Sequence, residues 1–167
     1  MKKLAIIVSI ICAFLFTAMG IKSVSANEMP TYCVIVDSDY GFSDNDHIMG
    51  MLEEKIQGDL MNPQTTVEAL ENIAPDKEVS DLSTEELQAL GKTLPVDYVV
   101  VLRVYNDSSY DDNIHNVNCV IDVVKTATGG EMSYMGNVLV AKGFVGEDEN
   151  RDALEQFIEF SDPIELK

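Results

Sequence analysis

The stretch over residues 96–144 constrains the fold most, because it predicts a three-stranded antiparallel meander. Residues 97–104 read Asp-Tyr-Val-Val-Val-Leu-Arg-Val, a run rich in the β-branched residues that favour strands. Residues 117–126 and 132–144 predict two further strands. Between these two, Thr-Gly-Gly-Glu at 128–131 predicts a hairpin turn, since paired glycines supply the positive φ that such turns require. The polar, acidic residues 106–116 predict a loop between the first two strands.

The first strand of this meander is apolar on both faces. One face carries Tyr98, Val100, Leu102 and Val104, and the other carries Val99, Val101, Arg103 and Tyr105. We therefore expect the strand to be covered on both sides, or covered on one side and in contact with a partner on the other. Arg103 is its one charged residue. The guanidinium pairs with an acid, reaches the sheet edge or anchors a partner, and the sequence leaves the three alternatives open.

Further elements surround the meander. A short apolar run at 31–36 predicts a buried strand. Apolar residues at helical spacing predict helices at 44–60, 84–92 and 147–160, and less strongly at 65–73, where a brief strand at 64–67 is the alternative. Together these predict a single α/β domain of the α+β type, with a mixed sheet of about four strands and helices mainly on one face.

Three smaller features complete the predicted domain. The helix at 84–92 begins with the capping box Ser-Thr-Glu-Glu at 83–86. Gly136 within the last strand predicts a bulge or bend. The tail over 161–167 is short, and we expect it to be loose.

The N-terminus has the layout of a secretory signal peptide over residues 1–26. Lys2 and Lys3 precede an apolar run, and small residues stand before a cleavage point at Ala26. The alternative is a retained membrane anchor, but the run is short for a bilayer span. Lipidation at Cys12 is disfavoured because Ile11 stands where a small residue is expected. We therefore expect residues 27–167 to form one secreted domain, periplasmic or extracellular, with no stable membrane insertion after cleavage.

The charge of that domain excludes some partners. All 29 acidic residues lie after residue 26, whereas 3 of the 11 basic residues precede it, so 8 basic residues face 29 acids and the net charge is −21. Such a surface repels nucleic acid and anionic lipid, and it suits basic partners or cations. A solvated acidic surface without a specific partner explains the charge equally well.

Two cysteines remain in the expected mature chain, Cys33 and Cys119. An even count in an oxidising compartment suggests a disulfide. Both cysteines also lie in apolar, strand-like runs, where buried free thiols are common. The sequence leaves both alternatives open.

Catalytic motifs are absent from the sequence. His47 and His115 have no neighbours at metal-ligand spacing, and neither H-E-x-x-H, C-x-x-C nor G-x-S-x-G occurs. We therefore expect no enzymatic activity and no cofactor. A hydrolase, which would need one of these histidines beside a nucleophile and an acid, is the least favoured hypothesis.

The acidic loop after the first strand gives one candidate metal site. Asp37 and Asp39 place oxygens at the first and third positions of a calcium loop, and Asp44 and Asp46 add carboxylates later in the same segment. The segment then departs from an EF-hand, with Phe42 at the glycine position and Ile48 at the bidentate glutamate position. Weak calcium binding here is one hypothesis, and turn residues with a helix N-cap are the alternative.

The block over 83–143 resembles the small α/β domains of bacterial envelope proteins. Gly91, the Asp-Tyr-Val-Val run at 97–100 and the Thr-Gly-Gly-Glu turn at 128–131, which has an extra glycine, match the pattern of the CsgG-like, LpoB-like and TolB N-terminal domains. The resemblance implies a helix-flanked mixed sheet, and a non-enzymatic role in binding another envelope or extracellular protein. Calcium binding by the acidic loops is the alternative function.

Overall fold

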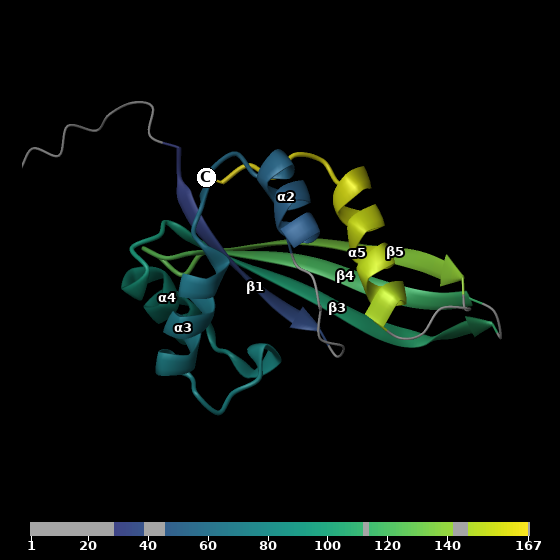
Figure 1. Ribbon diagram of the computed structural model, residues 1–167, viewed down its shortest axis with the longest axis horizontal. Helices are drawn as coiled ribbons and strands as arrows, with labels where there is room; N and C mark the ends of the chain where they lie inside the picture. The colour runs from purple at the N-terminus through teal and green to yellow at the C-terminus, as the bar shows by residue number, and fades with distance from the viewer. Residues whose placement is uncertain (1–28, 39–45, 112–113, 142–146, 167) are drawn as a thin grey trace, which may run out of the picture.

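A five-stranded mixed sheet forms the centre of the computed structural model (Figure 1), which describes residues 29–38, 46–111, 114–141 and 147–166. Its strands follow the order β2-β1-β3-β4-β5. They comprise β1 (Thr31–Ser38), β2 (Asp59–Leu60), β3 (Tyr98–Asp111), β4 (Ile114–Lys125) and β5 (Glu131–Ala141). β1 is parallel to β2 and β3, whereas β3, β4 and β5 form an antiparallel meander. The mixed α+β sheet and its C-terminal meander are therefore confirmed.

The sheet is larger than the sequence predicted. β2 adds a fifth strand within a segment that was predicted to be helical. β3 and β4 also continue into the predicted loop at 106–116, with register shifts beyond Asn106. The loop prediction was wrong because the polar residues there continue a two-stranded ribbon, whose backbone hydrogen bonds do not depend on apolar side chains.

Within the described residues four α-helices surround this sheet: α2 (Asp46–Lys55), α3 (Pro63–Ile73), α4 (Thr84–Thr93) and α5 (Glu147–Phe160), with a 3-10 turn η1 (Val79–Asp81) before α4. The predicted helix at 44–60 ends five residues early. Gly58 lies against the chain before β1, where a Cβ would be 2.5 Å from the carbonyl oxygen of Pro30. α3 begins at Pro63 because the side chain of Asn62 caps it, accepting a hydrogen bond from Gln64 N. The capping box of α4 is confirmed.

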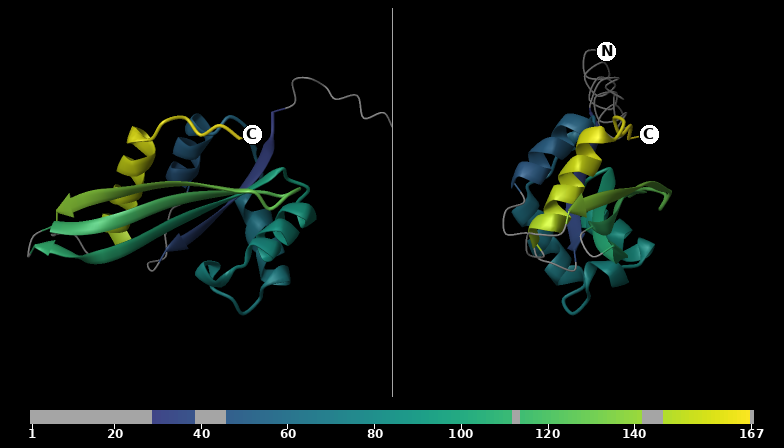
Figure 2. Two further views of the ribbon diagram at one scale, coloured as in Figure 1. Left: turned by 180° about the vertical axis from the view of Figure 1, so that it is seen from behind. Right: turned by 90° about the vertical axis from the view of Figure 1, so that its right-hand side faces the viewer.

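The helices cover both faces of the sheet, so the prediction that they lie mainly on one face was wrong. α2 and α5 lie on one face, and α3 and α4 lie on the other (Figure 2). The physical reason is the two-faced apolarity of β3, which needs cover on each side.

The sheet separates two hydrophobic cores. The larger core packs α2 and α5 on the sheet face that includes Tyr32, Leu102 and Ile121. The smaller core packs α3 and α4 on the face that includes Cys33, Val99 and Val101. Apolar side chains alternate between these cores along β3, as the strand period of two requires.

The C-terminal elements differ in two details from expectation. β5 keeps an unbroken register through Gly136, so no bulge occurs there. The glycine instead makes room for Phe157 of α5, whose ring atom Cε2 would lie 2.6 Å from a Cβ at this position. The tail is docked rather than loose, because Ile164 is fully buried and its N–H donates to the carbonyl of Lys55.

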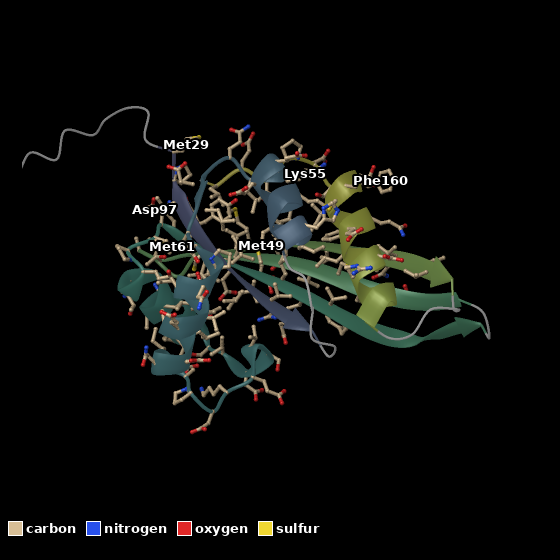
Figure 3. All side chains as sticks on the ribbon, viewed as in Figure 1. Met29, Met49, Lys55, Met61, Asp97 and Phe160 are labelled. Atoms are coloured by element: carbon tan, nitrogen blue, oxygen red, sulfur yellow. The ribbon has the colours of Figure 1, made fainter. Side chains whose placement is uncertain are left out.

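Lys55 joins the ends of two helices. Its Nζ, at the end of α2, donates to the carbonyls of Glu159 and Ser161 at 2.8 and 2.9 Å (Figure 3). These carbonyls lie at the C-terminal end of α5, where unsatisfied acceptors and the helix dipole favour a cation. The contact fixes α5 beside α2.

The residues of the envelope-domain resemblance have structural roles. The carboxylate of Asp97 accepts hydrogen bonds from N and Oγ1 of Thr31 at 2.9 and 3.1 Å, which fixes the start of β1 beside β3. Gly91 of α4 lies against Thr126, and a Cβ there would be 2.2 Å from Thr126 Oγ1. Gly129 in the β4–β5 turn has a φ of 71°. These positions therefore define the fold rather than a reaction site.

Candidate functional site

The sheet face that carries α3 and α4 is only partly covered by them. Beyond these helices the meander presents a surface that we call the open face, made of side chains from three strands: Arg103, Tyr105, Asn118, Val120, Asp122, Ser133, Met135, Asn137 and Leu139. Tyr105 is 43% exposed, Leu139 55% and Met135 76%. Figure 1 shows the three strands extending past α3 and α4. The open face is thus a mixed apolar and polar surface on rigid strands.

Arg103 lies at the boundary between the covered and the open parts of this face. Its Nη1 is 2.5 Å from Asp122 Oδ2 on β4, and its Nε is 3.8 Å from Asp37 Oδ2 at the end of β1. The hydroxyl of Ser133 on β5 donates to the other oxygen of Asp122. Four strands of the sheet therefore contribute to one polar network. Within it the side chain of Arg103 remains 31% exposed.

A groove opens beside this network. It has a volume of about 820 Å³ and lies between the strands and the segment before α4, which supplies residues 77–80. Arg103, Asp37 and Tyr105 line its sheet side. Lys77 on the opposite wall is held by Glu86, at 2.7 Å between Nζ and Oε1, and this bond lowers the pKa of the Glu86 carboxyl. The groove thus offers charged groups of both signs in fixed positions.

The structure shows the acid pairing that was one alternative for Arg103, and contact of its exposed part with a partner stays a prediction. The guanidinium pairs with acids, and one of them, Asp37, belongs to the predicted calcium site. Asp39 and Asp44 lie outside the described residues, as does the side chain of Asp46. Among the described residues, no group of three or more His, Cys, Asp or Glu side chains is placed to hold a metal ion. Calcium binding by this segment stays a prediction.

The two cysteines are free thiols in different cores. Cys33 packs with α3 and α4, whereas Cys119 packs on the opposite face of the sheet with α2 and α5. The disulfide alternative is therefore wrong in this structure, and the buried-thiol alternative holds. Burial raises the pKa of each thiol to about 12, so both are protonated and unreactive at neutral pH.

Neither histidine forms part of a site in the described structure. His47 is on the surface of α2, with Nε2 3.9 Å from Glu155 Oε1 on α5. The side chain of His115 lies outside the described part.

Sequence reasoning missed Asp122 and Ser133 as partners of Arg103. Both occupy outward positions in the alternation of their strands, so their presence on the half-polar face was predictable. Their contact with Arg103 follows from the register, in which Asp122 is opposite Val101 and Ser133 is opposite Asp122. Register was the information that the sequence lacked.

Comparison with known proteins gives likenesses of fold at low identity. The LpoB C-terminal domain from Salmonella enterica has 12% identity and a TM-score of 0.46, over 70% of this chain and 86% of that one. The lipoprotein GNA1162 from Neisseria meningitidis has 14% identity and a TM-score of 0.48, over 78% and 96%. TolB from Acinetobacter baumannii has 10% identity and a TM-score of 0.37, over 67% and 24%.

These likenesses agree with the bacterial envelope domains that the sequence resembles, at the level of the fold alone. No family model matches the chain, and no curated protein matches it. In the described part of the chain, no helix is both long and apolar enough to cross a membrane.

Proposed function

We propose that the protein is a non-catalytic module of the cell envelope, secreted or periplasmic, that binds another envelope or extracellular protein through the open face. The observation that carries the proposal is the fixed position of Arg103 among exposed apolar side chains. Asp37 and Asp122 hold the guanidinium, and Tyr105 and Met135 lie on the same face.

The composition of this face supports protein binding. Interfaces are enriched in tyrosine, methionine and arginine, and their strongest contacts cluster where such side chains meet. An arginine that is already held by two acids loses little conformational freedom when a partner arrives. A rigid sheet surface also keeps Tyr105 and Met135 in place without further ordering.

The proposed location rests on the N-terminal pattern. Residues 1–26 have the basic start, apolar run and small-residue end of a secretory signal. N-terminal sequencing of the protein from fractionated cells tests this point, and cleavage after Ala26 is the expected result. A chain that keeps its first residues and stays in the cytoplasm would contradict it.

Site-specific photo-crosslinking in intact cells tests the binding face. A photoreactive amino acid at Tyr105 should form a discrete adduct with one other protein, which mass spectrometry identifies. The same group at Val67, which is 53% exposed on α3, is the control for random collisions. An adduct at position 105 that is absent at 67 and is lost in the R103A variant supports the proposal. Equal adducts at both positions, or none, would refute it.

A further inference from the structure

β5 is an edge strand in the described structure, and its own residues 132–141 lack the charges, prolines and bulges that protect such edges from pairing. It ends the order of the sheet, and among the described residues no other strand pairs with its outer side. Natural edge strands carry charges, prolines or bulges that prevent association. Residues 132–141 contain no charge and no proline, and their register with β4 is unbroken. Such an edge accepts another strand.

The hydrogen bonds of the hairpin show which backbone groups point outward. Lys125 N donates to the carbonyl of Gly130 at 2.8 Å, so this opposed pair is a hydrogen-bonded one. Hydrogen-bonded pairs recur at every second residue of an antiparallel ladder, and Gly130 belongs to one of them. The even-numbered residues of β5 therefore direct their backbone N–H and C=O groups to β4. The outward groups then belong to Ser133, Met135, Asn137 and Leu139. Their side chains lie on the open face, so backbone and side chains present one continuous edge.

Exposed apolar side chains gather at the same edge. Met135 and Leu139 are exposed on one face of β5, and Phe160 at the end of α5 is 80% exposed (Figure 3). A groove of about 330 Å³ separates β5 from α5, and Leu139, Phe157 and Phe160 line it. These side chains would be buried by a strand that continues the sheet.

We propose that β5 pairs antiparallel with β5 of a second copy of this chain. The two five-stranded sheets then form one continuous sheet of ten strands. With Asn137 on the two-fold axis, each Met135 lies opposite Leu139 of the other copy, and the two Asn137 amides face each other. This register pairs apolar with apolar and amide with amide.

Charge favours a second copy as the occupant. The chain carries a net charge of −18, so two copies repel over most of their surface. At the neutral strip over 132–141 the two copies can meet without placing like charges opposite each other. A basic peptide would find no acid on this strip to recognise. Salt screens the general repulsion, so dimerisation should strengthen as ionic strength rises.

Sedimentation of the purified chain at low and high salt tests the proposal. We expect a dimer that high salt favours. M135K/L139K should raise the dissociation constant at least about tenfold, because each lysine would lie opposite another. M135K/L139E should restore the dimer, since the register then places opposite charges together. M29K/V67K adds the same charge at two exposed positions away from β5 and should not weaken the dimer.

Amide hydrogen exchange gives an independent readout. In the dilute monomer, protection should alternate along β5, with rapid exchange at Ser133, Met135, Asn137 and Leu139. In the dimer all four amides should become protected. A chain that stays monomeric at every salt concentration overturns the proposal, as does a dimer without these protections or one that M135K/L139E fails to restore. If the four amides became protected only when another protein is added, that protein would be the partner of the β5 edge, and the dimer proposal would be overturned. Each of these failures leaves the binding proposal for Tyr105 intact.

Discussion

Replacing Gly91 with alanine tests whether the close contact between α4 and the β4–β5 turn determines the packing. A Cβ at this position would lie 2.2 Å from Thr126 Oγ1 and 2.9 Å from Thr126 Cγ2. Thr126 is only 7% exposed, so it has little room to move. Overpacking of this kind costs about 1–3 kcal/mol, whereas alanine gains about 1 kcal/mol over glycine in a helix. We expect G91A to lower the free energy of unfolding by up to about 2 kcal/mol.

The contact also predicts a specific rescue. Thr126→Ala removes the two clashing atoms, and it removes a hydroxyl that has no hydrogen-bond partner among the described residues. In that background G91A should be neutral or stabilising by up to about 1 kcal/mol, so the coupling between the two substitutions should be about 2 kcal/mol.

Urea denaturation of the four variants measures this coupling. G50A is the matched control, since Gly50 lies in α2 with no atom within 4 Å of its added Cβ, and it should stabilise the protein by up to about 1 kcal/mol. An equal effect of G91A with and without Thr126 would refute the reasoning.

Three further predictions concern the cores, a helix cap and the polar network. Burial raises the pKa of Cys33 and Cys119 from 9.0 to about 12, so neither should react with a thiol reagent at neutral pH until the chain unfolds. The thiols ionise at a lower pH in the unfolded chain than in the folded one, so the free energy of unfolding should fall as the pH rises from 9 towards 12. Alkaline denaturation measures this, and a stability that does not change over this pH range would contradict it. S83A removes the capping side chain of α4 and should cost about 1 kcal/mol in urea denaturation; a loss below a few tenths would show that the cap contributes little. D122A leaves a partly buried guanidinium without its nearest acid and should cost about 1–3 kcal/mol, clearly more than S133A, and the reverse order would reject the network as described.

Local patterns in the sequence correctly predicted those helices and strands whose determining residues lie within the element itself. The helix at Thr84–Thr93 has its capping box, and the closing helix at Glu147–Phe160 has its apolar stripe and acidic first turn. The meander followed from alternation and from the glycine turn. In each case the residues that determine the element are neighbours in the chain.

The features that were missed depend on distant contacts. β2 is only two residues long and exists because it meets β1, so no period marks it in the sequence. Gly136 was predicted to bend its strand, whereas the ring of Phe157 explains it. Arg103 was recognised as unusual, but its partner Asp37 comes from a parallel neighbour, and no local pattern reports that register.

The parallel pairing of β1 with β3 has a consequence for how the chain reaches this fold. Thr31 and Asp97, which bond at the start of the two strands, are 66 residues apart. Closing a loop of that length costs about 4 kcal/mol of chain entropy, whereas the hairpins of the meander close far shorter loops. We expect β3, β4 and β5 to assemble first and β1 to join late, so substitutions in β1 should mainly accelerate unfolding. Synthesis runs in the opposite order, so most of β1, which in the described structure meets β2 only at Thr31 and Tyr32, must wait for β3 to follow it.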